Sequence, residues 1–281
     1  MLAAALGALA LAGCGQPATG RIIAVRSAVT AAPQPQTIDA AALTQRIAQD
    51  LAQADSVGSI PGGDHLTGSL LPITSNLSVP ASERLLALEQ QGLALIDARL
   101  NDLSTLENLV TTSTHISPPV RALLLSRLAY AYNGLSSLRA TIAGETLLDQ
   151  TRAALRNIDG TYHVLGVLDP QVRMMAAADG ILQLAALDTT QLAGLNRKLA
   201  QDQRAGVGTG DAAGLLADMS NRIRTMTQEA DQALSTLAGV DPSQYPANQP
   251  TLTAMHNLLN SAHAAASLAA ADATNARTAM P

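Results

Sequence analysis

The amino-acid sequence predicts an all-α protein, folded as an elongated antiparallel helical bundle with coiled-coil hairpins. Apolar residues recur at alternating steps of three and four in several segments of roughly 26–30 residues, a spacing that keeps them on one face of a helix. The 281-residue chain contains no Phe, no Trp and only four Tyr. Residues that favour strands are therefore sparse, and a core of aliphatic side chains suits close helix–helix packing better than a sandwich or barrel.

Composition and charge limit the classes of function. Charged residues make up 14% of the chain and the net charge is −5, whereas soluble proteins usually contain about 25% charged residues. A weakly acidic chain does not attract phosphate backbones, which argues against a nucleic-acid partner. About 267 residues follow the N-terminal apolar run, enough for one large domain or two small ones.

The segment 37–79 is predicted to contain one short helix followed by an irregular linker. Thr37 is expected to cap a helix that runs to about Ala54. Glycine and proline then interrupt the helical pattern, which favours irregular structure. These interrupting residues are Gly58, Pro61, Gly62, Gly63, Gly68, Pro72 and Pro80.

The helical bundle domain is expected over residues 80–281, and its first two helices are predicted at 82–112 and 117–144. Ser117 precedes Pro118 and Pro119, a strong helix start because the hydroxyl can cap the helix and the first turn does not need proline's missing N–H. Gly144 is expected to end the second helix. The apolar stripes comprise Leu85, Ile96, Leu100, Leu103, Leu106 and Val110 in the first helix, and Leu124, Leu128, Ala131, Leu135, Leu138 and Ile142 in the second.

A third helix is predicted after a break of a few residues, so that it lies antiparallel to the second. Thr146 and Asp149 have the spacing of a capping box, with Asp in place of the usual Glu or Gln. Pro170 is expected to kink or break this helix, because proline lacks the backbone donor and clashes with the preceding turn. The third seam comprises Leu148, Thr151, Leu155, Ile158, Tyr162 and Leu165.

Helical patterns continue in three segments after Pro170. Gly206, Gly208 and Gly210 mark one loop, and the prolines between Asp241 and Pro250 mark the next. We expect the end of the last helix to fray, because its alanine seam buries little area per turn. The three seams comprise Val172, Ala176, Ile181, Leu184, Leu192, Leu195 and Leu199, then Leu216, Met219, Ile223, Met226, Ala230, Ala233 and Leu237, then Leu252, Met255, Leu259, Ala262, Ala266 and Ala269.

The dipeptide Asp169-Pro170 is the candidate for a binding site or hinge in the bundle, together with Tyr162. The third seam would place its next apolar residue at Asp169, and a proline follows at once. Two local rules therefore fail at adjacent positions, which is typical of functional or strained sites. The alternative is a helix–loop–helix corner, in which Asp169 caps the next helix and Pro170 occupies its first turn.

The N-terminal segment is predicted to be an export signal. Its apolar run of about 11 residues is too short to span a bilayer but fits the core of a secretory signal. The run ends in Leu11-Ala12-Gly13-Cys14, which resembles the lipobox of bacterial lipoproteins, and Cys14 is the only cysteine in the chain. The resemblance implies a signal peptide over residues 1–13, an acylated Cys14, and a flexible tether over residues 14–36. Cleavage by ordinary signal peptidase after Ala10 or Ala12 is the alternative.

Two stretches, 96–110 and 135–186, resemble a loose group of exported bacterial helical proteins that carry no assigned function. The shared motifs are helix-packing patterns, so the resemblance implies a helical fold and adds nothing about chemistry. The matching residues are Ile96, Arg99 and Leu100 in the first helix, Leu138 and Ile142 in the second, and Tyr162, Val164, Pro170, Ala177, Ala178 and Asp179 in the third.

The sequence contains no catalytic constellation, and we predict a protein that is not an enzyme and has no cofactor and no metal site. His256 and His263 lie seven residues apart, about 10.5 Å along a helix, whereas a shared metal would prefer a spacing of four. The glycine-rich segment 206–210 lacks the Gly-Lys-Ser/Thr of a phosphate loop, which favours a flexible linker.

Two classes of function remain. The first is a non-catalytic structural or interaction protein of the cell envelope, a scaffold or adaptor held to the membrane through acylated Cys14 and bound to another envelope protein. The second is a small-ligand-binding lipoprotein with its site near the Asp169-Pro170 break. A large internal pocket beside Tyr162 would favour the ligand binder, and a filled seam would favour the scaffold. With Gly15 after the cysteine, the resemblance to lipoproteins implies the outer membrane, on its periplasmic side or at the surface, in a cell with two membranes, and otherwise the outer face of the cytoplasmic membrane.

Overall fold

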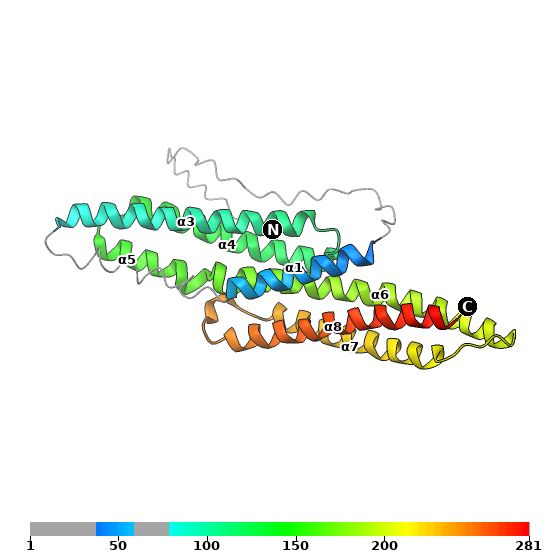
Figure 1. The fold of residues 1–281 in the computed structure, drawn as a ribbon. Helices are drawn as coiled ribbons and strands as arrows, with labels where there is room; N and C mark the ends of the chain where they lie inside the picture. The colour runs from blue at the N-terminus through cyan, green and yellow to red at the C-terminus, as the bar shows by residue number, and fades with distance from the viewer. Residues whose placement is uncertain (1–37, 59–78, 281) are drawn as a thin grey trace, which may run out of the picture. The chain divides into compact units, whose positions relative to one another are not determined.

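The computed structural model describes residues 38–58 and 79–280 and shows a helical bundle (Figure 1). Seven α-helices and no β-strand occur in these residues. The helices are α1 (Ala40–Gly58), α3 (Ala81–Thr112), α4 (Pro118–Gly144), α5 (Leu148–Asn157), α6 (Asp169–Arg204), α7 (Ala212–Ala238) and α8 (Gln249–Ala279). Two π-helical turns, η1 (Ile158–Tyr162) and η2 (Val164–Leu168), lie between α5 and α6, and a 3-10 turn, η3 (Pro242–Gln244), precedes α8. The predicted all-α bundle is confirmed.

Helices α3 and α4 pack against each other along the predicted seams. The seam of α4 is buried as predicted except at Leu138, which is half-buried. In α3 the stripe agrees with the prediction at four positions, whereas Leu85 and Leu100 are half-buried. Gly92 is buried in α3 because Leu155 of α5 lies against it, and a Cβ at this position would overlap that side chain. The buried stripe of α3 comprises Leu88, Gly92, Ile96, Arg99, Leu103, Leu106 and Val110.

The predicted caps of α4 and α5 are wrong. Ser117 makes no cap hydrogen bond, because its hydroxyl donates instead to Oδ1 of Asp179 on α6, at 3.0 Å. Helix α5 begins after Leu147, again without a side-chain cap, so Thr146 and Asp149 form no capping box. Both serine and threonine lose the local role that their sequence context suggested, and in the case of Ser117 a tertiary contact replaces it.

Helix α1 packs against α6 and α8. It starts two residues later than predicted, with Oδ1 of Asp39 accepting a hydrogen bond from the Ala41 N–H at 2.9 Å, and Thr37 lies outside the described residues. Gly180 of α6 allows the close approach of α1, because a Cβ there would lie 3.0 Å from Cγ1 of Ile47. The short predicted helix is therefore an integral part of the helical body.

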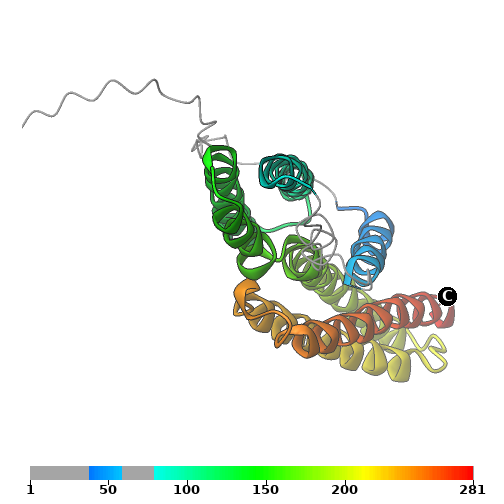
Figure 2. The same cartoon turned by 90° about the vertical axis from the view of Figure 1, so that its left-hand side faces the viewer.

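Helices α1, α6, α7 and α8 form a four-helix bundle, and Figure 2 shows α7 and α8 running side by side. Every predicted seam residue of α7 and α8 is buried. The α6–α7 loop contains Gly206 at φ 71° and Gly210 at φ 45°, left-handed conformations that favour glycine. The predicted fraying of α8 is wrong: Ala273 and Ala276 are fully buried, and the helix runs to Ala279. Small alanine side chains let α7 and α8 pack closely along their length.

Candidate functional site

The helical path between α5 and α6 breaks at His163, not at Pro170 as predicted. His163 adopts a left-handed backbone conformation at φ 37°, between the two π-helical turns. The Leu168 N–H donates to the His163 carbonyl, five residues back, at 3.2 Å. Pro170 lies in the first turn of α6, where a missing N–H is tolerated, as the corner interpretation predicted. Both π-helical turns and left-handed non-glycine residues are enriched at functional sites.

Three of the chain's four tyrosines surround this break. The ring centroid of Tyr162 lies 6.4 Å from that of Tyr130 on α4, and the ring centroid of His163 lies 4.6 Å from that of Tyr245. Tyr162 reaches α4 because Gly134 leaves room for its ring, and a Cβ there would overlap it. Burial raises the pKa of the Tyr162 hydroxyl, and Tyr130 raises it further. We call Tyr130, Tyr162 and Tyr245 the tyrosine cluster.

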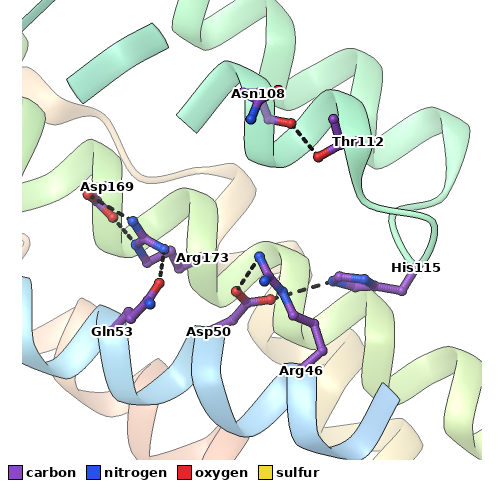
Figure 3. A network of polar contacts seen from close by, with 8 residues as sticks. All are labelled: Arg46, Asp50, Gln53, Asn108, Thr112, His115, Asp169 and Arg173. Carbon is purple, nitrogen blue, oxygen red and sulfur yellow. Dashed lines mark hydrogen bonds and ion pairs between the residues drawn. The ribbon is translucent and has the colours of Figure 1, made fainter. Parts of the chain in front are cut away.

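Asp169 does not cap α6 but forms an ion pair with Arg173, one turn along the helix. Arg173 donates through Nε and Nη2 to the two carboxylate oxygens, and through Nη1 to Gln53 of α1 (Figure 3). Burial raises the pKa of Asp169, and the interaction with Arg173 opposes that shift. Asp169 is 6% exposed and Pro170 is buried as well. Asp169 is thus linked through Arg173 to Gln53 and belongs to the contact between α6 and α1.

A second buried carboxylate, Asp50 of α1, lies between the side chains of Arg46 and His115 in Figure 3. Its Oδ1 is 3.3 Å from Nη2 of Arg46, and its Oδ2 is 3.5 Å from Nε2 of His115 in the α3–α4 connection. Asp50 is completely buried, and a buried carboxylate is tolerated only when it is paired. The pairing with His115 therefore ties α1 to the α3–α4 hairpin.

His256 and His263 of α8 contact the backbone of α1. Their Nε2 atoms contact the carbonyl oxygens of Leu51 at 3.1 Å and of Thr44 at 3.3 Å. The histidines are seven residues apart on α8 and the carbonyls are seven apart on α1, so the two helices meet in register. The sequence placed the two histidines seven residues apart on one helix, but it did not show that the backbone of another helix would lie opposite them.

The C-terminal end of α7 is capped by long-range side chains near the same break. Gln171 of α6 donates to the Leu237 carbonyl at 2.6 Å and to the Val240 carbonyl at 3.1 Å. Arg127 of α4 donates to the carbonyls of Val240 and Ala238, and burial lowers the pKa of this arginine. Because the last carbonyls of a helix have no partner within it, these contacts fix the start of the α7–α8 connection beside His163.

A groove of about 470 Å³ lies between α7 and α8, and none of Tyr162, Asp169 and Pro170 lines it. Nε of Arg222 in this groove donates to Oδ2 of Asp272 at 2.6 Å, and Asp272 is only 8% exposed. The arginine is therefore held by a buried carboxylate. The groove is lined by Asp218, Asn221, Arg222 and Thr225 from α7, and by Ser261, Ala264, Ala265 and Leu268 from α8.

Cys14, the predicted acylation site, lies outside the described residues. Within residues 38–58 and 79–280, no helix is long and apolar enough to cross a membrane. The same part of the chain contains no group of three or more His, Cys, Asp or Glu side chains placed to hold a metal ion. Comparisons with protein-family models, with curated proteins and with solved structures find no significant match to this chain.

Proposed function

We propose that this chain is a lipid-anchored, non-catalytic interaction protein of the cell envelope, a scaffold or adaptor that binds a partner protein through the tyrosine cluster. The observation that carries the proposal is the exposure of Tyr130, which is 72% exposed in a chain without Phe or Trp. Tyrosine is enriched at protein interfaces, because its ring offers apolar area and its hydroxyl can form a hydrogen bond.

The tyrosine cluster is held on a well-packed scaffold. Tyr130 projects from α4, Tyr162 lies against Gly134, and Tyr245 packs on the ring of His163. Side chains that are already ordered lose little entropy on binding, which favours tight association for a small contact area. The strained backbone of His163 sits at the centre of this arrangement and supports a functional role.

A small-ligand site near Asp169-Pro170 is the second candidate function. It would need polar groups that can turn toward a ligand. The carboxylate of Asp169 is occupied by Arg173, which also donates to Gln53, and Pro170 is buried. A ligand would have to displace this ion pair, so these contacts favour the interaction protein over the ligand binder.

Site-specific photocrosslinking in intact envelopes tests the proposed partner surface. A photoreactive amino acid replaces Tyr130 in one variant and the exposed Ser104 of α3 in the control. We expect a discrete protein adduct from position 130 that is absent from position 104 and that competes with excess unmodified protein. Identical adduct patterns from both positions, or none from position 130, would contradict the proposal.

The proposed anchor at Cys14 is tested separately. Acylated cysteine with two or more chains binds membranes stably, so Cys14→Ser should move the protein from the membrane fraction to the soluble fraction. The thermal unfolding of the variant should match that of the unanchored wild-type body. A Cys14→Ser protein that stays in the membrane after a carbonate wash would show that the anchor lies elsewhere.

A further inference from the structure

We propose that a second copy of this chain docks on the groove between α7 and α8, forming a symmetric dimer held by Asp218 and Arg222. The proposal rests on the charges, the composition and the area of this face. It does not depend on the protein that the tyrosine cluster binds, because the groove is lined by other residues on other helices.

The two charged side chains of the groove are complementary to a second copy of themselves. Asp218 and Arg222 are one turn apart on α7, and within the described residues Asp218 forms no ion pair or hydrogen bond. Arg222 uses Nε to reach Asp272, which leaves Nη1 and Nη2 without a partner in that part of the chain. In a twofold contact residue i meets residue j and j meets i, so antiparallel α7 helices would form the Asp218–Arg222 pair twice.

The α8 side of the groove has the composition of an interface. Between Met255 and Arg277 the only Asp, Glu, Lys or Arg is Asp272, which is buried and paired. Leu268 is 48% exposed and lies beside Ala264. The cores of protein interfaces are depleted in charged residues, and small side chains let helices approach closely. In the dimer, the α8 side of the groove would therefore bury Leu268 against the second copy.

Full contact along both helices would supply the area that a stable dimer needs. Helices α7 and α8 have 27 and 31 residues, which makes them about 40 Å and about 47 Å long. Two helices with axes 8–10 Å apart present a face about 20 Å wide. The product is about 800 Å², the area that each partner contributes to an interface of standard size.

A co-purification experiment with charge-reversed variants, using two differently tagged copies of the full chain, tests the dimer. Both copies are co-expressed and purified through one tag, and the second tag is quantified. Wild-type copies should co-purify, whereas Asp218→Arg with itself should lose at least about tenfold because two arginines then meet. Arg222→Asp with itself should lose at least as much, because two aspartates then meet and the buried Asp272 also loses its arginine. Mixing Asp218→Arg with Arg222→Asp restores both ion pairs, and co-purification should recover to within about threefold of the wild type.

Two controls separate the interface from folding. Arg224→Asp changes a neighbouring exposed arginine of α7 outside the groove and should leave co-purification unchanged. Leu268→Lys keeps the Arg222–Asp272 contact and should still weaken co-purification, with unchanged thermal unfolding. Wild-type copies that do not co-purify, single variants that co-purify like the wild type, or a mixed pair that stays as weak as the single variants would each overturn the proposal.

Discussion

Asp188 of α6 should destabilise the folded protein at neutral pH. Its side chain is 8% exposed, no cation within the described residues pairs with it, and burial raises its pKa from 3.8 to about 6. A carboxyl whose folded pKa exceeds its unfolded pKa binds more protons in the folded state, so the free energy of unfolding falls as pH rises. The loss develops between pH 3.8 and about pH 6 and is complete above that range.

The magnitude follows from the size of the pKa shift. The difference between 3.8 and about 6 is roughly two units, equivalent to about 3 kcal/mol. Asp188→Asn removes the charge but keeps a buried polar group, which offsets part of the gain. We therefore expect the variant to gain about 1–3 kcal/mol in the free energy of unfolding at neutral pH, and almost nothing below the unfolded pKa.

Urea unfolding followed by far-ultraviolet circular dichroism measures this difference between wild type and variant across pH. Asp231→Asn, at an exposed position of α7, is the matched control and should stay within about 0.5 kcal/mol of the wild type at every pH. The reasoning fails if Asp188→Asn has wild-type stability at neutral pH. It fails equally if the gain is as large in acid as at neutral pH, because the effect would then not come from ionisation.

Two further predictions concern helix packing. Leu135→Asp replaces a fully buried seam residue of α4 and should lower the free energy of unfolding by roughly 3–5 kcal/mol. Ser137→Asp on the exposed face should lower it by less than about 0.5 kcal/mol. Equal thermal midpoints for the two variants would show that the helix faces are misassigned. Gly134→Ala must displace the Tyr162 ring and should cost about 1–3 kcal/mol. Gly194→Ala, in a helix with open space around it, should stabilise by about 0.5–1 kcal/mol, and a stabilising Gly134→Ala would refute the close packing.

The helices and their buried faces could be predicted because the apolar pattern is a local property. A helix repeats every 3.6 residues, so residues three and four apart share a face whatever the partner is. The seams of α7 and α8 follow this rule at every predicted position. Leu85, Leu100 and Leu138 depart from it, since each is only half-buried.

Helix caps and the helix break could not be predicted with the same success. Ser117 has a good local reason to cap α4, but its hydroxyl meets Asp179, which is 62 residues away in sequence. The expected kink at Pro170 disappears because the chain already breaks at His163, which places the proline in a first turn. For Ser117 a contact between distant segments outweighs a local capping preference worth about 1 kcal/mol.

Only part of the candidate site could be predicted from the sequence. Tyr162 and Asp169 were singled out from the sequence, and both lie at the junction of α5 and α6, yet Asp169 is held by Arg173 and Tyr162 belongs to the tyrosine cluster. Neither Tyr130 nor Tyr245 carried a signal of its own, because each is an ordinary residue in its own segment. Their convergence depends on how α4 and the α7–α8 connection pack around His163.

The sequence by itself determined the all-α class, the positions of the main helices and the faces that they bury, since these follow from periodicity and from the conformational limits of glycine and proline. Only the tertiary structure decided which helices pack together. It also decided that His256 and His263 contact the backbone of α1 and that Asp50 lies beside His115. Those contacts depend on burial, which requires each polar group to find whatever partner lies nearest in space rather than in sequence.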